Sequence, residues 1–528
     1  MKDADQPAGR DIVMKKRVVS LLMAAVMGIG VLVGCGAQGG QAESVGEAAA
    51  YNGEPAELTM YLLGDRATDF DLVYEEVNRI LKEEINTTLN VKFLSWSEHD
   101  TKYSLLFSSG EDFDLIFTAS NWGHYETTAA KKGFYELTED FVQTYAPELW
   151  ETVTDDAWNQ AKIDGKIYMV PANVKEYEEA VVGVRGDLMG KYGFEDITTM
   201  EELERFFDQV AEKEEGVSPL ATQGAALQWP SLLYGRGRNV VRGVPSILFT
   251  YEYVNPDNLE IEYLIESPDF LEYAKKMKEW YSKGFWSADA ISSTDTPYDN
   301  WIQGKSAAMA WNLGAVVTYG QEMNKNHPEW KADFIVLNPD QPKAMSPYIN
   351  NGMAINAASK NKERAMMVLN ELMTNKEIQN ITAYGLEGTH WEAEGNMEYL
   401  PISENSSRYP ADGSCNWGWG NQKIKRTLHV LEDDYLTQKM NATRDKWDEN
   451  TKNPHILSAF AFNEEKVKSE AAVVNTVVSQ YFMPISLGMV DDADAAVEEF
   501  ARKLKEAGID KIYEEVKQQT AEFAAANQ

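Results

Sequence analysis

Residues 58–94, LTMYLLGDRATDFDLVYEEVNRILKEEINTTLNVKFL, carry the pattern that decides the fold. The stretch opens with an alternating apolar segment, LTMYLL, and closes with a second one, LNVKFL, and both are typical of strands. Between them, apolar residues recur at helical spacing from Phe70 to Leu81. A helix predicted at 98–107 and a third apolar segment, DLIFTAS at 114–120, follow. This order of strands and helices predicts a parallel sheet with crossover helices.

The carboxyl ends of these strands predict where a ligand binds, because ligands of open parallel sheets sit outside those ends. The sequence places Asp65 and Arg66 after the first strand, Trp96 after the second, and Asn121 and Trp122 after the third. Sugars present apolar C–H faces and a rim of hydroxyl groups, so aromatic rings beside polar side chains suit them. We therefore predict a carbohydrate site at this edge.

Later in the chain, other tryptophans also stand next to polar residues or glycine. The chain has 14 Trp, 25 Tyr and 19 Phe in a strongly polar sequence. The candidates at predicted loop positions are Trp229, Trp311, Asn312 and Trp417. The alternative for each tryptophan is ordinary partial burial in the core. The neighbours of Trp122, Trp311 and Trp417 are polar or glycine rather than apolar runs, which favours ligand contact for these three.

Three arginines, Arg236, Arg238 and Arg242, lie close together in YGRGRNVVRG, within an otherwise acidic protein. They suit a ligand that carries a carboxylate, such as a uronic acid, because guanidinium groups bind carboxylates through two hydrogen bonds. The alternative is that they pair with neighbouring acidic side chains on the surface.

The segment 14–35, MKKRVVSLLMAAVMGIGVLVGC, has the order of a secretory signal: basic residues, an apolar run, then small residues. Its last four residues resemble a bacterial lipobox, in which Cys35 receives a diacylglyceryl group and becomes the mature N-terminus. The apolar run is shorter than the roughly 30 Å hydrocarbon core, so a membrane-spanning anchor is the weaker interpretation. Translation from Met14 is the simplest account of the acidic residues before it. Residues 36–57, rich in Gly, Ala, Gln and Glu, are predicted to be a flexible tether.

Charge and cysteine content exclude several classes of protein. The net charge is −35, and removing residues 1–34 takes away five basic and three acidic residues and leaves −37. Such a chain does not suit nucleic acid or an anionic lipid surface. Besides Cys35 the only cysteine is Cys415, so no internal disulfide is expected. No HExxH or Cys-rich spacing occurs among the six histidines, and we predict neither a metal site nor a cofactor.

Several motifs, in their order along the chain and together with the lipobox, resemble family 1 extracellular solute-binding proteins of bacterial ABC sugar importers, and in particular long, LplA-like lipoproteins. The motifs are SSGEDFDLIFTASNW (108–122), GKIYMVP (165–171), SPDFLEYAKKMKEWYSKGFW (267–286), WIQGKSAAMAWNLG (301–314), YINNGMAIN (348–356) and YGLEGTHW (384–391).

The resemblance implies an α/β fold of two hinge-linked, discontinuous lobes that hold the ligand between them, followed by a helix-rich C-terminal part. The motifs contain three further candidate ligand-binding residues: Asn351, Glu387 and Trp391. Gly385 and Gly388 permit a tight loop after a helix, in which Glu387 accepts sugar hydroxyl groups and Trp391 is a stacking ring. For Glu387 and Trp391, a helix end followed by a packed turn is an equal alternative. The predicted division is a signal peptide at 1–34, the lipidated cysteine and tether at 35–57, a first lobe at 58–173 plus 305–350, and a second lobe at 174–304 plus 351–528.

The predicted function follows from the resemblance: a monomeric solute-binding protein, tethered by lipid to the outer face of the membrane after Sec export, delivers an oligosaccharide to an ABC permease. No catalytic residues, cofactors or nucleic-acid partners are expected. The alternatives are a secreted glycoside hydrolase, a glycan adhesin, or a binding protein for peptides or acidic saccharides. A hydrolase needs two suitably spaced carboxylates, but so acidic a chain contains such pairs by chance.

Overall fold

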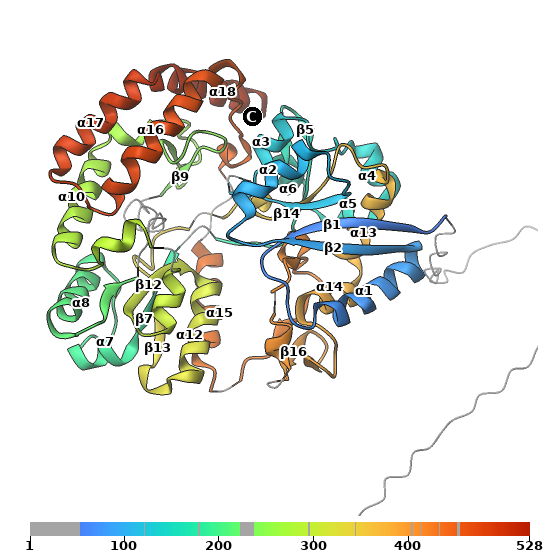
Figure 1. The fold of residues 1–528 in the computed structure, drawn as a ribbon, viewed down its shortest axis with the longest axis horizontal. Helices are drawn as coiled ribbons and strands as arrows, with labels where there is room; N and C mark the ends of the chain where they lie inside the picture. The colour runs from blue at the N-terminus through green and yellow to red at the C-terminus, as the bar shows by residue number, and fades with distance from the viewer. Residues whose placement is uncertain are drawn as a thin grey trace, which may run out of the picture. The chain divides into compact units, whose positions relative to one another are not determined.

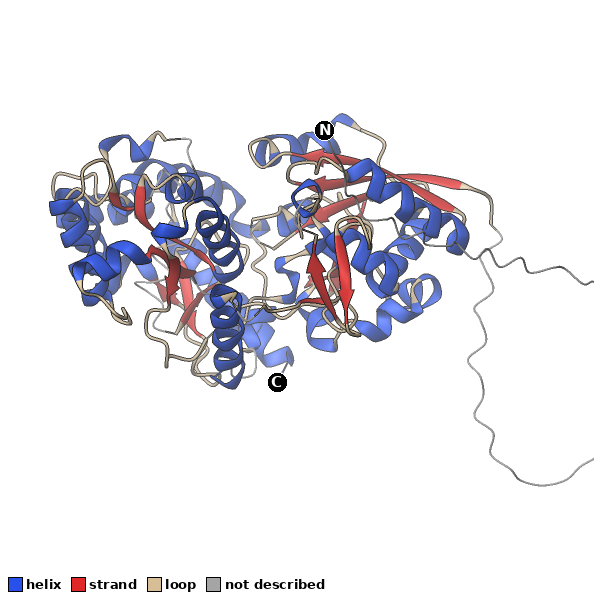
Figure 2. Cartoon of the chain, turned by 90° about the horizontal axis from the view of Figure 1, so that it is seen from below, coloured by secondary structure: helices blue, strands red, loops and turns tan. Residues whose placement is uncertain are grey.

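The computed structural model describes residues 53–120, 122–177, 180–221, 237–293, 296–343, 345–402, 405–411, 413–431, 433–450 and 455–527. They form a two-lobe α/β fold, and each lobe has its own sheet and its own apolar core. The strands of both sheets lie among helices (Figure 2). The predicted fold class is therefore confirmed. The predicted signal peptide, Cys35 and most of the predicted tether lie outside the described residues.

The first lobe contains a five-stranded sheet in the order β2 (Thr87–Leu94), β1 (Ala56–Leu63), β3 (Leu115–Thr118), β14 (Gly352–Ile355) and β6 (Val170–Pro171). β1 pairs parallel with β2 and β3, as the strand–helix order predicts. β14 is antiparallel to both β3 and β6. The carboxyl ends of β1, β2 and β3 therefore meet at one edge.

Helices from two distant parts of the sequence share the core of this lobe. α1 (Phe70–Ile85) buries Val73, Val77 and Ile80, which confirms the helical spacing read from the sequence. α13 packs against α1, α4 and α5. The helices are α1, α2 (His99–Ser109), α3 (Tyr125–Ala130), α4 (Glu139–Tyr145), α5 (Pro147–Thr152), α6 (Asp155–Gln160), α13 (Lys362–Thr374) and α14 (Lys376–Tyr384).

Two smaller sheets accompany the five-stranded sheet. One pairs β4 (Lys162–Ile163) with β5 (Lys166–Ile167). The other has the order β15 (Trp391–Glu394), β16 (Glu398–Pro401) and β17 (Thr427–Leu428).

The second lobe contains a four-stranded sheet in the order β13 (Ala332–Ile335), β7 (Ala180–Arg185), β12 (Ser306–Asn312) and β8 (Ser218–Leu220). β7 is antiparallel to both of its neighbours, and β12 is parallel to β8. A three-stranded sheet adds β11 (Glu262–Tyr263), β10 (Phe249–Glu252) and β9 (Arg238–Val240). The helices here are α7 (Gly186–Tyr192), α8 (Met200–Lys213), α10 (Pro268–Ser282), α11 (Pro297–Ile302), α12 (Leu313–Asn326) and α15 (Tyr435–Asn450).

The last three helices, α16 (Lys468–Ser486), α17 (Ala493–Glu506) and α18 (Ile509–Asn527), pack into the core of the second lobe. α16 and α17 lie beside α10, which comes some 200 residues earlier in the chain (Figure 1). The apolar stripes of this region bury Val474, Phe500 and Ile512. The predicted helix-rich C-terminal part is present.

The strand pairings differ from the predicted division of the lobes. That division put 305–350 in the first lobe and 351–528 in the second. β12 instead pairs with β7 in the second lobe, and β14 pairs with β3 in the first. The sequence prediction failed here because both strands are short and buried on both faces, and periodicity then indicates a buried strand but not the sheet to which it belongs.

The close packing around Gly352 in β14 predicts that a side chain at this residue destabilises the fold. A Cβ atom at this residue would lie 2.5 Å from the carbonyl oxygen of Val170 and would also meet the Met169 side chain. Gly352→Ala is therefore expected to destabilise the fold by about 1–3 kcal/mol, because neighbouring backbone must shift. Urea unfolding followed by circular dichroism measures this change.

Gly190→Ala is the matched control for Gly352→Ala. Gly190 lies in α7, and a Cβ atom there meets nothing within 4 Å. Alanine at this position should leave stability unchanged or raise it by about 0.5–1 kcal/mol. Equal stability of the two variants would contradict the tight packing at β14.

Candidate ligand-binding site

Three tryptophans come together at the predicted edge of the first sheet. Trp96 follows β2, Trp122 follows β3, and Trp417 lies in the short turn Asn416–Trp419. The ring centroid of Trp96 is 6.2 Å from that of Trp122 and 6.4 Å from that of Trp417, with interplanar angles of 28° and 14°. Trp96 is 56% exposed and Trp122 38% exposed, whereas Trp417 is half-buried. We call these three side chains the aromatic cluster.

Local packing fixes the positions of Trp122 and Trp417. Gly123 makes the loop after β3 tight, because a Cβ atom there would lie 2.5 Å from the backbone nitrogen of Ala119. This turn presents Trp122, whose ring contacts Phe117 at 5.5 Å between centroids. Phe117 also meets Trp417 edge-on at 6.3 Å. One buried phenylalanine in β3 thus supports two rings of the cluster.

Polar groups border the aromatic cluster on the side of β14. The indole Nε1 of Trp122 donates a hydrogen bond to Oδ1 of Asn350 at 3.3 Å. The amide groups of Asn350 and Asn351 both donate to Oε2 of Glu176, at 3.1 Å and 3.4 Å. Asn351 was a predicted site residue, whereas Asn350 and Glu176 were missed. The paired Asn350-Asn351 was a usable signal, but Glu176 lies in an acidic run that gives none.

Asp65 and Arg66 follow β1 at the same edge and are exposed. Arg66 forms an ion pair with Asp71 in the first turn of α1, and its guanidinium group lies 5.0 Å from the ring centroid of Phe70. The charge of Arg66 is therefore already partly balanced within the protein.

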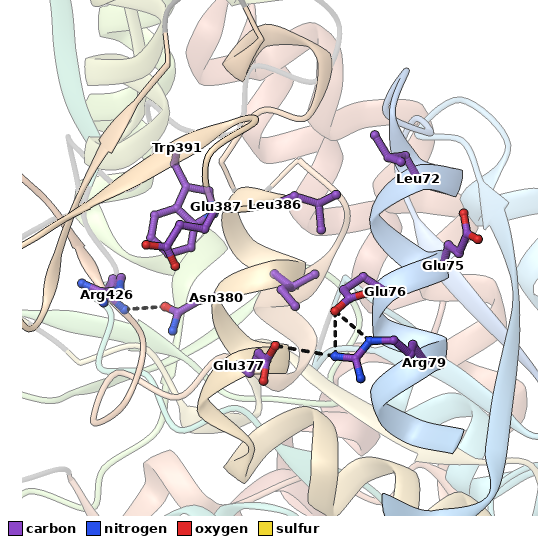
Figure 3. Close-up of a pocket in the computed structure, with 11 residues that line it drawn as sticks. Leu72, Glu75, Glu76, Arg79, Glu377, Asn380, Leu386, Glu387, Trp391 and Arg426 are labelled. Carbon is purple, nitrogen blue, oxygen red and sulfur yellow. Dashed lines mark hydrogen bonds and ion pairs between the residues drawn. The ribbon is translucent and has the colours of Figure 1, made fainter. Parts of the chain in front are cut away.

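Glu387 and Trp391 line a different pocket, between α1 and α14 (Figure 3). Trp391 is only 3% exposed, packs against Tyr384 and Tyr399, and donates from Nε1 to the carbonyl oxygen of Gly385 at 2.8 Å. Its ring is therefore part of a small core, as the packed-turn alternative predicts. The pocket is lined by Leu72, Glu75, Glu76, Arg79, Glu377, Asn380, Ile381, Leu386, Glu387, Trp391 and Arg426.

Two of the remaining predicted residues, Trp311 and Asn312, lie in β12 of the second lobe. Trp311 is half-buried at the end of β12 and packs against the core around α12. Asn312 caps α12, because its Oδ1 accepts a hydrogen bond from the backbone N–H of Ala315 at 2.9 Å. Asn121 and Trp229 lie outside the described residues.

The arginines of YGRGRNVVRG pair with groups of the protein itself. Arg238 forms ion pairs with Asp269 and Glu262. Arg242 is 4% exposed, donates from Nε to the carbonyl oxygen of Phe460 at 2.9 Å, and lies 3.9 Å from Glu126. Arg236 lies outside the described residues. These contacts favour the structural interpretation of Arg238 and Arg242 over binding of a ligand carboxylate.

One histidine, His99, lies beside Trp122 of the aromatic cluster, and a second, His124, lies beside His99. The ring of His99 is 6.2 Å from that of Trp122 and 4.9 Å from that of His124. Burial lowers the pKa of His99, and the positive charge of a protonated His124 lowers it further, against the opposing effect of Asp100. Burial also lowers the pKa of His124, again opposed by Asp100. Both imidazoles are therefore predominantly neutral at pH 7.

These shifts predict that the protein loses stability in mild acid. The folded pKa values lie below the unfolded value of about 6.5, so the unfolded chain binds more protons as the pH falls through that value. The stabilising contribution of the neutral rings is fully present above pH 6.5 and is lost below it. The measurement is the urea midpoint of unfolding at pH 7.5 and at pH 5.5, with EDTA present to exclude bound metal ions. From the higher to the lower pH, the midpoint should fall less in His124→Gln than in the unaltered protein. An equal fall in both would contradict the assignment.

Among the residues that the structure describes, no helix combines the length and the apolar character needed to cross a membrane.

The chain belongs to the bacterial extracellular solute-binding proteins. Residues 77–388, more than half of the chain, match this family. This finding confirms the resemblance read from the sequence motifs. Residues 456–525, which include α16, α17 and most of α18, match a domain of unknown function (DUF3502).

Individual relatives agree with the family. A carbohydrate ABC transporter substrate-binding protein of Streptococcus pneumoniae is 27% identical over 487 residues, which are 90% of this chain and 92% of that protein. The N-glycan transport solute binding protein NgtS of S. pneumoniae, in complex with Man5GlcNAc, is 25% identical with a TM-score of 0.69, covering 90% of this chain and all of that one. The alginate-binding protein AlgQ2 without calcium ion, at 15% identity and a TM-score of 0.67, covers 90% of this chain and all of that one. At that identity, AlgQ2 supports the fold alone.

Proposed function

We propose that this protein captures an oligosaccharide outside the cell and delivers it to an ABC permease. The observation that carries the proposal is the aromatic cluster. Trp96, Trp122 and Trp417 offer nearly parallel, partly exposed rings beside amide and carboxylate groups, the combination that sugar rings require. The family and the carbohydrate transport proteins related to this chain support the same ligand class.

The ligand that fits the cluster best is a neutral saccharide. The polar groups that border the cluster are the amides of Asn350 and Asn351 and the carboxylate of Glu176. The negative charge of this carboxylate repels an acidic ligand. Arg238 and Arg242, which would have suited a uronic acid, already pair with acidic side chains. Acidic saccharides therefore rank behind neutral oligosaccharides, and a peptide ligand stays an alternative.

The mechanism that we propose is closure of two lobes around the ligand. Open and closed arrangements are in equilibrium, and a ligand that contacts both lobes favours the closed arrangement by its additional contacts. The permease then recognises the closed protein, which acts as a monomer. The chain itself makes and breaks no bond in this cycle.

The first experiment is a titration of residues 36–528 with a panel of neutral and acidic oligosaccharides, followed by tryptophan fluorescence. The same samples are analysed by chromatography for shortened products. A saturable fluorescence change with intact sugar supports the proposal and identifies the ligand class. Shortened products would replace it with a glycoside hydrolase, and binding of peptides alone would replace the ligand class.

Trp96→Ala tests the role of the aromatic cluster directly. Loss of one stacking ring should weaken oligosaccharide binding by at least about tenfold, or about 1.4 kcal/mol, as measured by isothermal titration calorimetry. Because the ring is 56% exposed, the fold should be retained. Val473→Ala, at a side chain of α16 that is 52% exposed, is the control and should bind normally. Unchanged affinity of Trp96→Ala would remove the cluster from the binding site.

We also propose that the protein is a lipoprotein, anchored through Cys35 after export by the signal at 14–34. Two or more acyl chains hold a protein stably on a bilayer, whereas an unlipidated chain has no such anchor. Cys35→Ala should therefore abolish incorporation of labelled fatty acid into the protein. Cys415→Ala is the control and should retain the label, because Cys415 is fully buried in the first core. Label that persists in Cys35→Ala would contradict the lipidation site.

A further inference from the structure

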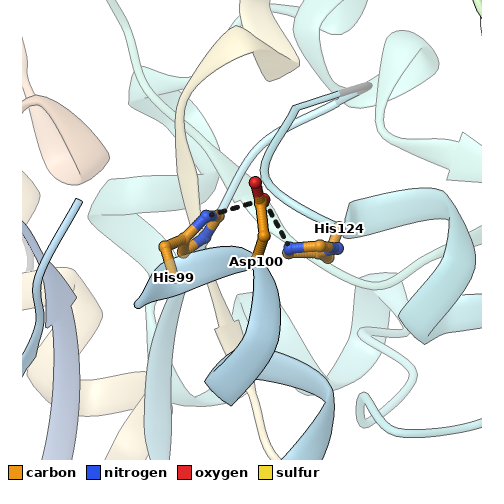
Figure 4. Close-up of side chains that lie close together, drawn as sticks. All are labelled: His99, Asp100 and His124. Atoms are coloured by element: carbon orange, nitrogen blue, oxygen red, sulfur yellow. Dashed lines mark ion pairs between the residues drawn. The ribbon is translucent and has the colours of Figure 1, made fainter. Parts of the chain in front are cut away.

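His99, Asp100 and His124 form a compact group at the start of two helices of the first lobe (Figure 4). His99 and Asp100 are the first two residues of α2, and His124 immediately precedes α3. Oδ1 of Asp100 lies 3.5 Å from Nδ1 of His99 and 3.5 Å from Nε2 of His124. One ligand atom from each of the three residues falls within 4.8 Å of the other two.

We propose that these three side chains bind a divalent transition-metal ion, with zinc as the best fit. Two imidazole nitrogens and one carboxylate oxygen are ligands that zinc uses in proteins. This inference does not depend on oligosaccharide binding. It adds a site where the sequence spacing predicts none, because His124 lies 25 positions after His99.

The spacing of the ligand atoms suits a tetrahedral ion with little movement. Bond lengths of about 2.0–2.1 Å place neighbouring ligand atoms about 3.3 Å apart around zinc. The two distances from Asp100 are already close to this value. The two imidazole nitrogens need to approach one another by at most about 1.5 Å.

The surroundings of the two histidine rings favour a metal. Nε2 of His124 is buried and has no hydrogen-bond partner among the described residues, although it points toward Asp100. Nε2 of His99 is likewise buried without a partner in the described part of the chain. If Nε2 of His99 carries the proton, the lone pair of Nδ1 faces Asp100 and the metal position.

The ligand set leaves a coordination position open to solvent. Asp100 is 87% exposed, whereas the His99 side chain is only 6% exposed. The ion would therefore have protein on the histidine side and water on the other, which is the usual form of a three-ligand zinc site. No chemical step follows from this arrangement.

The position of the site indicates what the metal does. Trp96 lies three residues before His99, and Trp122 two residues before His124. A metal bound to both histidines would join the loop after β2 to the loop after β3, and so fix two rings of the aromatic cluster. Ordering these loops in advance lowers the entropy lost when a ligand binds. The metal would therefore act as a positioning element.

The test uses the full chain without a polyhistidine tag, kept in solution by a mild non-ionic detergent and stripped of metal with EDTA. Equilibrium dialysis against zinc chloride, read out by mass spectrometry of the metal, should give one tightly bound equivalent that Asp100→Asn and His124→Gln weaken by at least about tenfold. Asp100→Asn changes an exposed side chain, so its result does not depend on a fold defect. Zinc binding that is unaltered in both variants would overturn the proposal.

His327→Gln is the matched control. His327 also lies beside a carboxylate, because its Nδ1 is 3.3 Å from Oε1 of Glu329. Its side chain is 44% exposed, and this pair contains a single histidine. Its replacement should leave the zinc stoichiometry and affinity unchanged. Cobalt supplies a second readout, because tetrahedral Co²⁺ with nitrogen ligands absorbs visible light. That absorption should appear in the unaltered protein and in His327→Gln, and its persistence in His124→Gln would contradict the assignment.

Discussion

The return of β14 to the first lobe is the constraint on which the rest of the structure depends. This strand lies between β3 and β6, where it is antiparallel to both, and all four of its residues are buried. It fits because Gly352 has no side chain to meet Met169 and Val170. The residues just before it supply the amides of Asn350 and Asn351, and those after it lead into α13 and α14. One strand therefore completes the sheet, carries polar groups to the aromatic cluster and brings two helices into the core.

Local sequence pattern was sufficient for the first three strands and the helices between them. The apolar spacing of α1 and the alternation in β1 depend on neighbouring residues only, so they can be read without a tertiary structure. The positions of Trp96 and Trp122 then follow from the rule that ligands bind beyond the carboxyl ends of parallel strands. Trp417 was selected by its polar and glycine neighbours, but its contact with Phe117 joins segments 300 residues apart and cannot be derived from spacing.

The predictions that failed depended on which buried elements pack together. β12 reads as a buried strand, and nothing in its seven residues distinguishes a partner in one sheet from a partner in the other. Trp391 stands among glycine and polar residues, as a loop tryptophan does, yet its ring packs between two tyrosines. Glu176 and the pair of His99 with His124 were missed for the same reason, because each contacts residues that are far away in the sequence. Such contacts are determined by packing, which sequence periodicity does not encode.

The arrangement of charge is compatible with the neutral ligand that we propose, although the chain has many acidic residues. The aromatic cluster is supported by Phe117, and Glu176 bordering it shares its carboxylate with two amides. Recognition at such a site would depend on ring faces and hydrogen bonds, whose geometry requires that the loops be held in place. Trp96 and Trp122 lie in two separate loops, one after β2 and one after β3. The metal proposed at His99 and His124 would join these two loops and so keep both rings in position.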